Sequence, residues 1–165
     1  MNSSTESRPV AIVTGASGGL GSATARALQI EGYRLVLMSR SGCKDIAEET
    51  GGIGVAGSVL SDADIDRTVA TALDAFGRVD AAVFGAGRHS EVMKGHKVPT
   101  PPPATRDSFN YDPDYQREIF DIPWPAWHDD YEMMVVAPMR LAKAVLPYIG
   151  ANGRGSIVAI SGIEA

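Results

Sequence analysis

A glycine-rich turn near the amino terminus constrains this chain more than any other feature. Its residues, Thr14–Gly21, read TGASGGLG and stand between an apolar run at Val10–Val13 and a helical pattern that begins at Gly19. Glycine lets the backbone bend sharply and lets a ligand approach closely, while the first N–H groups of a helix carry a partial positive charge. A buried strand, a glycine turn and a helix in this order therefore predict an anion site for a phosphate group.

Size and composition are those of an ordinary soluble globular protein. The 165 residues are 44% hydrophobic and 21% charged, and the formal net charge is -5. An acidic chain is a poor partner for nucleic acid or for an anionic membrane, so neither is expected as a main partner. The single cysteine, Cys43, excludes an internal disulfide, and no apolar stretch is long enough to span a bilayer. We expect a cytoplasmic protein with a disordered tail at 1–8 and a single domain at 9–165.

Strand and helix patterns alternate from Pro9 onward. The expected strands are Val10–Val13, Arg34–Ser39, Ile53–Ala56, Ala81–Phe84 and Ser156–Ile160. The expected helices are Gly19–Ile30, Lys44–Thr50, a helix capped by Ser61-Asp62 that runs to Phe76, and Trp127–Ile149. Such alternation predicts the α/β class, with a doubly wound parallel sheet in the order 3-2-1-4-5. The ligand of such a sheet lies beyond the carboxyl ends of the first and fourth strands, where the winding reverses.

The segment at about 88–130 interrupts this alternation. It contains Pro99–Pro103, which favours an extended polyproline path, and turn-rich aromatic stretches at Asn110–Tyr115 and Ile122–His128. A loop of this length in a compact domain is usually functional or mobile, so we expect a long loop or flap here. A surface flap without any ligand role is an equally good interpretation. The tryptophans favour partial packing, because an exposed tryptophan is poorly placed.

Three motifs in register resemble the short-chain dehydrogenase/reductase family. The glycine turn is similar to the family's cofactor signature, and Phe76–Asp80 with Val83–Gly87 resembles its FGxxD segment and the NNAG motif that follows. Leu141–Pro147 with Gly155–Ser161 resembles its central helix and fifth strand. The resemblance runs from about Pro9 to the end of the chain. It implies a Rossmann-like fold and a nicotinamide dinucleotide as the ligand.

Residues after the second expected strand indicate which dinucleotide is bound. In such a fold this strand end faces the adenosine ribose, where a carboxylate accepts from a 2′-hydroxyl and repels a 2′-phosphate. The chain has Arg40 and Ser41 here and no acidic residue before Asp45. Arginine pairs with a phosphate bidentately, so we expect NADP(H) over NAD(H), the alternative being that Arg40 is a solvated loop charge. The expected cofactor-binding residues are Gly15, Ser17, Gly19, Leu20, Gly21, Arg40, Ser41, Val59, Gly85, Ala86 and Gly87.

The family's catalytic positions carry other residues in this chain. The position of an active-site Asn is Met134, and the position of the catalytic Ser after the fifth strand is Gly162. Phe84 and Gly85 replace the two Asn of the fourth-strand motif. The family's Tyr-xxx-Lys motif is expected after the last residue, Ala165. Because these groups supply acid–base catalysis worth about 10²–10⁴-fold, we assign no catalytic residue and expect weak or no turnover from this chain alone.

A proline four residues after Met134 bears on the same positions. Pro138 has no N–H for the Met134 carbonyl, so the backbone part of the family's proton relay can persist, unless the proline is a plain packing kink. Tyr131 lies three residues before Met134 on a shared helix face and is the substitute proton donor that we single out. Other possible donors in the flap are Tyr111, Tyr115 and His128.

Three functions remain open from the sequence. The first is an NADP(H)-dependent oxidoreductase acting on a carbonyl or alcohol, and the second is a non-enzymatic dinucleotide-binding pseudoenzyme or scaffold. The third is a fragment of a longer chain. The sheet is expected to be incomplete on its C-terminal side, which leaves Ser156–Ile160 as an apolar edge and favours a homo-oligomer. His89 and His96 lack neighbours at metal-ligand spacing, so we predict no metal.

Overall fold

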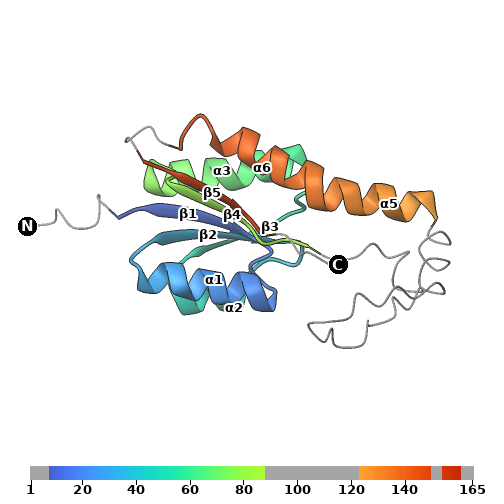
Figure 1. Ribbon diagram of the computed structural model, residues 1–165. Coiled ribbons are helices and arrows are strands. Elements are labelled where there is room, and N and C mark those ends of the chain that lie inside the picture. Colours follow the sequence, from blue (N-terminus) through green and yellow to red (C-terminus); the bar gives the residue numbers. More distant parts are fainter. Residues whose placement is uncertain (1–7, 88–122, 150–153, 161–165) are drawn as a thin grey trace, which may run out of the picture. The chain divides into compact units, whose positions relative to one another are not determined.

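Five parallel strands form the centre of the larger of two compact units into which the chain divides (Figure 1). The computed structural model describes residues 8–87, 123–149 and 154–160. The larger unit comprises Met1–Gly87 with Met133–Ala165, and the second comprises Arg88–Glu132. The strands of the larger unit are β1 (Val10–Thr14), β2 (Arg34–Ser39), β3 (Ile53–Ala56), β4 (Ala81–Phe84) and β5 (Ser156–Ala159).

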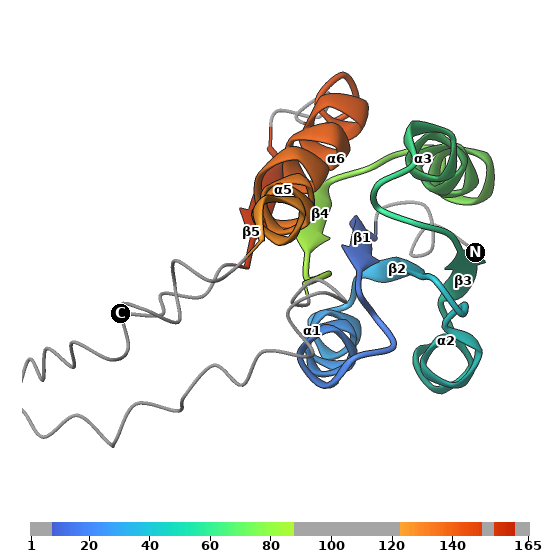
Figure 2. The same ribbon diagram turned by 90° about the vertical axis from the view of Figure 1, so that its right-hand side faces the viewer.

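The strand order confirms the predicted fold class. The sheet runs β3-β2-β1-β4-β5, and each neighbouring pair is parallel. Helices α1 (Gly19–Ile30) and α2 (Lys44–Thr50) cover one face, whereas α3 (Asp62–Phe76) and α6 (Ala137–Val145) cover the other (Figure 2). This is a doubly wound, Rossmann-like arrangement. None of the described helices is both long and apolar enough to cross a membrane.

Alternate residues of β1 belong to two separate hydrophobic cores, one on each face of the sheet. Val10 and Ile12 lie in the core that includes residues of α3 and α6, while Ala11 and Val13 lie in the core that includes residues of α1 and α2. All four side chains are fully buried. Because helices cover both faces of a parallel sheet, its central strands read as continuous apolar runs, and this is why their bounds could be predicted.

Most observed bounds agree with the predicted ones, and the differences are small in the first half of the chain. The bounds of β2, β3, β4, α1 and α2 are those expected from the sequence. Strand β1 extends one residue further, to Thr14, and β5 ends one residue earlier, at Ala159. Helix α3 has the predicted cap, because the Ser61 hydroxyl accepts from the Asp64 N–H at 3.3 Å.

The helix expected at Trp127–Ile149 is three consecutive elements instead. Helix α5 (Trp124–Tyr131) begins three residues earlier than expected and is followed by η2, a π-helical turn at Glu132–Val136, and then by α6. Pro138 is the second residue of α6 and has no N–H to donate to the Met134 carbonyl. A helix that loses this hydrogen bond departs from regular α geometry, here through a wider turn.

The second unit is described only by residues 123–132, which include α5. The flap was expected to have no regular element, but its described end is helical and has Pro125 in the first turn, where a proline is tolerated. Trp124 is 85% exposed and Trp127 is 47% exposed, so the partial packing expected of the tryptophans is not observed for Trp124. Residues 88–122 lie outside the described part of the chain.

Asp80 holds the amino ends of three strands together. Its carboxylate accepts from the Val10 N–H at 2.8 Å, its own N–H donates to the Val10 carbonyl at 2.9 Å, and its carbonyl accepts from the Ser156 N–H at 3.0 Å. Arg78 binds the same carboxylate, with Nε 2.8 Å from Oδ2. Burial raises the pKa of Asp80, but the Arg78 guanidinium and the Val10 N–H favour the carboxylate, and the net pKa lies below its usual value.

Replacing this carboxylate is expected to destabilise the sheet. Asp80→Asn should lower the free energy of unfolding by about 1–3 kcal/mol at pH 7, because it removes a charged acceptor from a backbone donor and from Arg78. The lowered pKa means that the carboxylate's contribution is present above its unfolded-state pKa of about 3.9 and is lost as the pH falls through the lower folded-state pKa. The difference between parent and variant should therefore shrink below about pH 4.

Urea denaturation of the two proteins at several pH values measures this difference. Asp74→Asn is the matched control, because Asp74 is an exposed carboxylate on α3. A stability loss in the control equal to that of Asp80→Asn would contradict the assignment.

Candidate functional site

The carboxyl ends of β1 and β4 meet at Gly15. This residue has φ 69°, and a Cβ built on it would lie 2.5 Å from the Gly85 carbonyl oxygen and 2.7 Å from the Ala86 Cα. Both the backbone conformation and the contact therefore require glycine. Gly85 is restricted from the other side, since its own Cβ would lie 2.9 Å from the Thr14 carbonyl oxygen. The residues after β1 and after β4 thus form one contact at the predicted point of reversal.

Gly21 and Gly19 have different roles in the turn. A Cβ on Gly21 would overlap the Gly15 carbonyl and would lie 2.9 Å from the Ala16 Cα, so α1 contacts the turn backbone directly. A Cβ on Gly19 would meet no heavy atom within 4 Å. Gly21 is therefore needed for packing, whereas the space beside Gly19 is open. A phosphate group can approach the amino end of α1 there.

Among the residues that the structure describes, no side chain caps the amino end of α1. Its N-cap, Gly18, forms no side-chain cap, and the first turn contains no acidic residue. The first N–H groups of a helix have no partner within the helix, and they carry the positive end of its dipole. By contrast, α3 is capped by Ser61 and has Asp62 and Asp64 in its first turn. Of these two helices, only α1 leaves its amino end available to an external anion.

A tight turn presents Arg40 and Ser41 at the end of β2. The Gly42 N–H donates to the Ser39 carbonyl at 3.1 Å, and the Ser39 hydroxyl donates to the Gly42 carbonyl. Arg40 and Ser41 are the two central residues of this turn, and both are exposed. The Ser39 carbonyl also accepts from the Gly57 N–H at 2.9 Å, which joins the turn to the loop after β3.

The remaining expected cofactor residues differ in what they expose. Ser17 and Leu20 are exposed beside the turn, whereas the Val59 side chain is only 7% exposed and packs in the core. Val59 can therefore reach a ligand only through its backbone. Gly85, Ala86 and Gly87 follow β4 at the same edge of the sheet. The largest side chain at these three positions is the Ala86 methyl, so no bulky group projects from this edge of the sheet.

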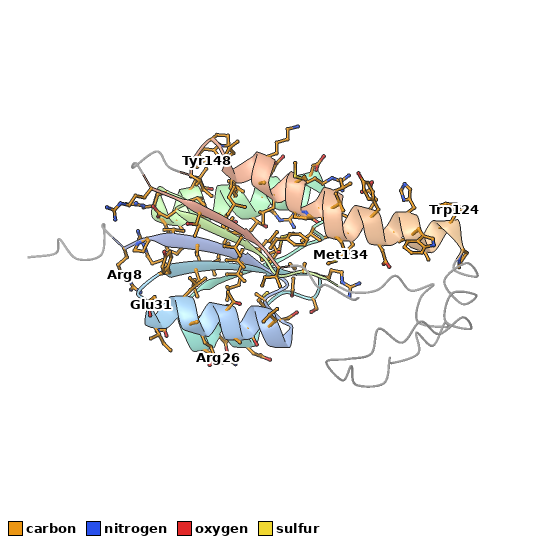
Figure 3. All side chains as sticks on the ribbon, viewed as in Figure 1. Arg8, Arg26, Glu31, Trp124, Met134 and Tyr148 are labelled. Carbon is orange, nitrogen blue, oxygen red and sulfur yellow. The ribbon has the colours of Figure 1, made fainter. Side chains whose placement is uncertain are left out.

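Met134 lies beside Gly87 at the end of β4 (Figure 3). Its sulfur is 3.6 Å from the position that a Cβ on Gly87 would take. Met134, the residue expected at the position of the family's Asn, therefore reaches this edge of the sheet, but a thioether cannot transfer a proton. The Met134 carbonyl receives no helical hydrogen bond from residue 138, because Pro138 has no N–H.

The other candidate proton donors belong to the second unit. Tyr131 and His128 belong to α5 in the second unit, and Tyr131 is 57% exposed. The candidates Tyr111 and Tyr115 lie outside the described residues, as do Gly162, which was expected at the position of the family's catalytic Ser, and the histidines His89 and His96. Within the described ranges there is no group of three or more His, Cys, Asp or Glu that could hold a metal ion.

Sequence reasoning missed a set of polar contacts on the loop after β3. The Asp64 carboxylate accepts from the Ser58 N–H at 2.9 Å and pairs with Arg67 at 2.7 Å. A Cβ on Gly57 would lie 2.9 Å from the Asp64 Cβ, so a glycine is needed for this approach. The spacing of Ser61 and Asp64 is a helix-capping pattern, and this was the available signal.

These features define a nucleotide-binding α/β protein, and comparison with known proteins identifies the family. The family model described as short chain dehydrogenase matches residues 9–101. The chain belongs to the short-chain dehydrogenase/reductase family. Membership implies a nicotinamide dinucleotide cofactor.

Individual relatives extend this similarity along the chain. This chain is 29% identical over 159 residues to granaticin polyketide synthase putative ketoacyl reductase 2 of Streptomyces violaceoruber, and the match covers 94% of this chain and 55% of that protein. It is 33% identical over 162 residues to an uncharacterized oxidoreductase of Staphylococcus haemolyticus, covering 94% of this chain and 59% of that protein. The crystal structure of a 3-oxoacyl-(acyl-carrier protein) reductase from Brucella melitensis matches with a TM-score of 0.68 and 25% identity, covering 94% of this chain and 58% of that one. The chain spans little more than half the length of the curated relatives it matches.

The two glycines of the turn should respond differently to the same substitution. Gly21→Val is expected to lower the free energy of unfolding by about 1–3 kcal/mol, because its Cβ overlaps turn backbone that cannot move away freely. Gly19→Val should change it by less than about 0.5 kcal/mol, because its side chain enters open space. Urea denaturation of both variants measures the contrast. Equal stability losses would show that the described packing around Gly21 is wrong.

Proposed function

We propose that the protein is an NADP(H)-dependent oxidoreductase that acts on a carbonyl or alcohol substrate. In this proposal the residues described above bind the dinucleotide. The observation that carries it is the uncapped amino end of α1, which is open beside Gly19 and has no carboxylate in its first turn. Two of the matched proteins are named as a putative ketoacyl reductase and a 3-oxoacyl-(acyl-carrier protein) reductase, and these names support carbonyl chemistry.

The pyrophosphate of the cofactor is assigned to the amino end of α1. Its two negative charges would meet the N–H groups of Gly19, Leu20 and Gly21 and the positive end of the helix dipole. Ser17 is exposed beside these groups and can add a hydroxyl donor. Because Gly15 and Gly85 are in close contact, the turn does not project from the sheet edge, and the cofactor can pass over it from β1 toward β4.

The 2′-phosphate of NADP(H) is assigned to Arg40 and Ser41. Both residues are exposed in the turn after β2, and the turn contains no carboxylate to repel a phosphate. A guanidinium can donate two parallel hydrogen bonds to phosphate oxygens, and a hydroxyl can donate a third. Val59 contributes through its backbone on the neighbouring loop.

The cofactor supplies a hydride when it is bound, and this chain orients it. Gly87 and Met134 lie together at the end of β4, where the nicotinamide end of a dinucleotide running from β2 across α1 would arrive. The thioether of Met134 provides an apolar surface and excludes water, but it does not hold or move a proton. Proton transfer to the substrate therefore requires another group.

The expected homo-oligomer and cytoplasmic location remain part of this proposal. The apolar residues Met139 and Leu146 of the helix around α6 are 67% and 64% exposed, and Val158 of β5 is 48% exposed. Exposed apolar side chains at neighbouring elements favour association with another copy. The acidic composition and the single cysteine are typical of a cytoplasmic protein.

The Arg40 assignment predicts a cofactor preference. The parent should bind NADPH more tightly than NADH by about 10- to 150-fold, since a hydrogen-bonded charge pair is worth about 1.5–3 kcal/mol. Arg40→Asp should erase or reverse this preference, because a carboxylate repels the 2′-phosphate and accepts from a 2′-hydroxyl. Fluorescence titration of both cofactors measures the two dissociation constants.

Two variants control for general effects of charge and fold. Arg154→Asp makes the same change of charge at an exposed residue before the amino end of β5, and it should leave the preference intact. Gly19→Val should bind neither cofactor while remaining folded. Equal affinity of the parent for NADPH and NADH would refute the role of Arg40, and normal binding by Gly19→Val would refute the pyrophosphate site.

Turnover by the 165-residue chain is expected to be weak. The position of Met134 offers no acid or base, and general acid–base catalysis contributes about 10²–10⁴-fold. Substrate-dependent oxidation of NADPH over a panel of aldehydes and ketones should therefore stay close to the background rate. Robust turnover would overturn this expectation and would direct mutagenesis to Tyr131, beginning with Tyr131→Phe.

A further inference from the structure

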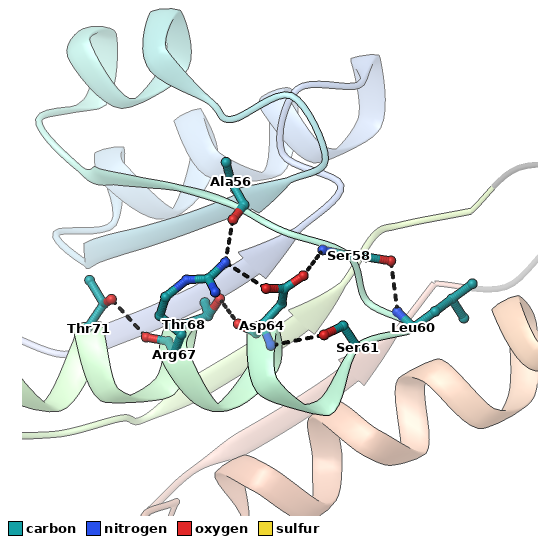
Figure 4. A network of polar contacts seen from close by, with 8 residues as sticks. All are labelled: Ala56, Ser58, Leu60, Ser61, Asp64, Arg67, Thr68 and Thr71. Atoms are coloured by element: carbon teal, nitrogen blue, oxygen red, sulfur yellow. Dashed lines mark hydrogen bonds and ion pairs between the residues drawn. The ribbon is translucent and has the colours of Figure 1, made fainter.

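Helix side chains, rather than a regular element, hold the backbone of the loop between β3 and α3 (Figure 4). Arg67 of α3 donates to the Ala56 carbonyl at 2.6 Å, and Asp64 of the same helix accepts from the Ser58 N–H at 2.9 Å. The two side chains are also paired with each other at 2.7 Å. One ion pair therefore binds the backbone of the last residue of β3, Ala56, and of the second loop residue, Ser58.

A third contact reaches the loop from the neighbouring helix. Arg140 of α6 donates to the Leu60 carbonyl at 2.8 Å and pairs with Asp62 at 3.3 Å. The Leu60 N–H in turn donates to the Ser58 hydroxyl at 3.2 Å. Val59 lies between two residues whose backbone groups are bound, so its own backbone has little freedom to shift.

The same loop is fastened to the turn that carries Arg40. The Gly57 N–H donates to the Ser39 carbonyl, and Ser39 directly precedes Arg40. The Asp64 side chain packs against Gly57, because a Cβ there would lie 2.9 Å from the Asp64 Cβ and 3.1 Å from its Cγ. Movement of Asp64 would therefore displace Gly57, and with it both the loop after β3 and the end of β2.

The electrostatics of Asp64 favour this arrangement. The Ser58 N–H donates to the carboxylate, Arg67 pairs with it and the Ser61 hydroxyl lies nearby, and together they lower the pKa of Asp64 despite the opposing effect of burial. The Asp64 side chain is 24% exposed, whereas the Arg67 side chain is 53% exposed. Asp64 is thus ionised at neutral pH and can accept from both partners at once.

We propose that Asp64 is a positioning residue for the adenosine end of the dinucleotide site. By binding the Ser58 N–H and packing on Gly57, it sets the backbone path at Val59 and the placement of the turn that presents Arg40. This inference rests on the proposed function. Asp64 itself does not touch the cofactor, since its carboxylate is occupied by Ser58 and Arg67.

The sign of the expected effect separates positioning from simple electrostatics. If only electrostatics mattered, removing a negative charge near an anionic ligand would tighten binding, because it relieves Coulomb repulsion. If Asp64 positions the loop, Asp64→Ala should instead weaken binding by about 10- to 100-fold, because small displacements of binding groups are costly. Asp64→Asn keeps one oxygen acceptor for the Ser58 N–H and should lie between the parent and the alanine variant.

The probe is adenosine 2′,5′-bisphosphate, which carries the adenine, the ribose and the 2′-phosphate without the nicotinamide half. Calorimetric titration of the parent, Asp64→Ala, Asp64→Asn and Asp66→Ala gives four dissociation constants. Asp66 is the matched control, because it is an exposed carboxylate on the same helix. Hydrogen exchange at the Ser58 amide is a second, local readout, which should accelerate in both Asp64 variants and remain unchanged in Asp66→Ala.

The outcomes distinguish this inference from the function on which it rests. Failure of the parent to bind the probe and NADPH would overturn the proposed function. Normal binding by the parent, with equal or tighter binding by Asp64→Ala, would overturn the role of Asp64 alone. Should Asp64→Ala fail to fold, the asparagine variant decides: weaker binding with faster exchange at Ser58 supports the positioning role, and parental affinity refutes it.

Discussion

The close approach of the turn after β1 to the residues after β4 is the constraint on which the rest of the site depends. Gly15 and Gly85 each lack a Cβ where one would clash with the backbone of the other segment, and Gly21 lacks one where α1 crosses the turn. These contacts bring a strand end, a helix start and a second strand end to one point. Larger side chains would separate them and would fill the space in which a phosphate group can lie.

From this point the site extends in two directions along the edge of the sheet. Toward β4 it reaches Gly87 and the thioether of Met134, which form an apolar surface. Toward β2 and β3 it becomes polar, with Arg40 in a tight turn and a loop held by charged side chains from α3. These surfaces match, in order, a ligand that is apolar at one end, anionic in the middle and phosphorylated at the other end.

The sequence was sufficient for the sheet but not for the details of the site. Val10–Val13 and Leu35–Met38 are continuous apolar runs because both faces are covered, so these strands could be predicted to within one residue. The pattern TGASGGLG does not reveal that Gly21 meets backbone while Gly19 meets open space, because this depends on the angle at which α1 leaves the turn. The π-helical turn before Pro138 also escaped prediction, since a proline can be absorbed by a kink or by a wider turn. Asp64 was missed because its partner, the Ser58 N–H, is set by the path of an irregular loop.

The contrast between the amino ends of α1 and α3 has a consequence for how a ligand is registered on the protein. Both helices follow parallel strands of one sheet, β1 and β3, yet α3 carries Ser61, Asp62 and Asp64 in and before its first turn. The Ser61 hydroxyl accepts from the Asp64 N–H of the helix, and the two carboxylates would repel a second anion. A pyrophosphate displaced along the edge from α1 would be repelled at α3. Of these two helices only α1 can therefore hold it, and this fixes how the molecule attached to the pyrophosphate is aligned on the sheet.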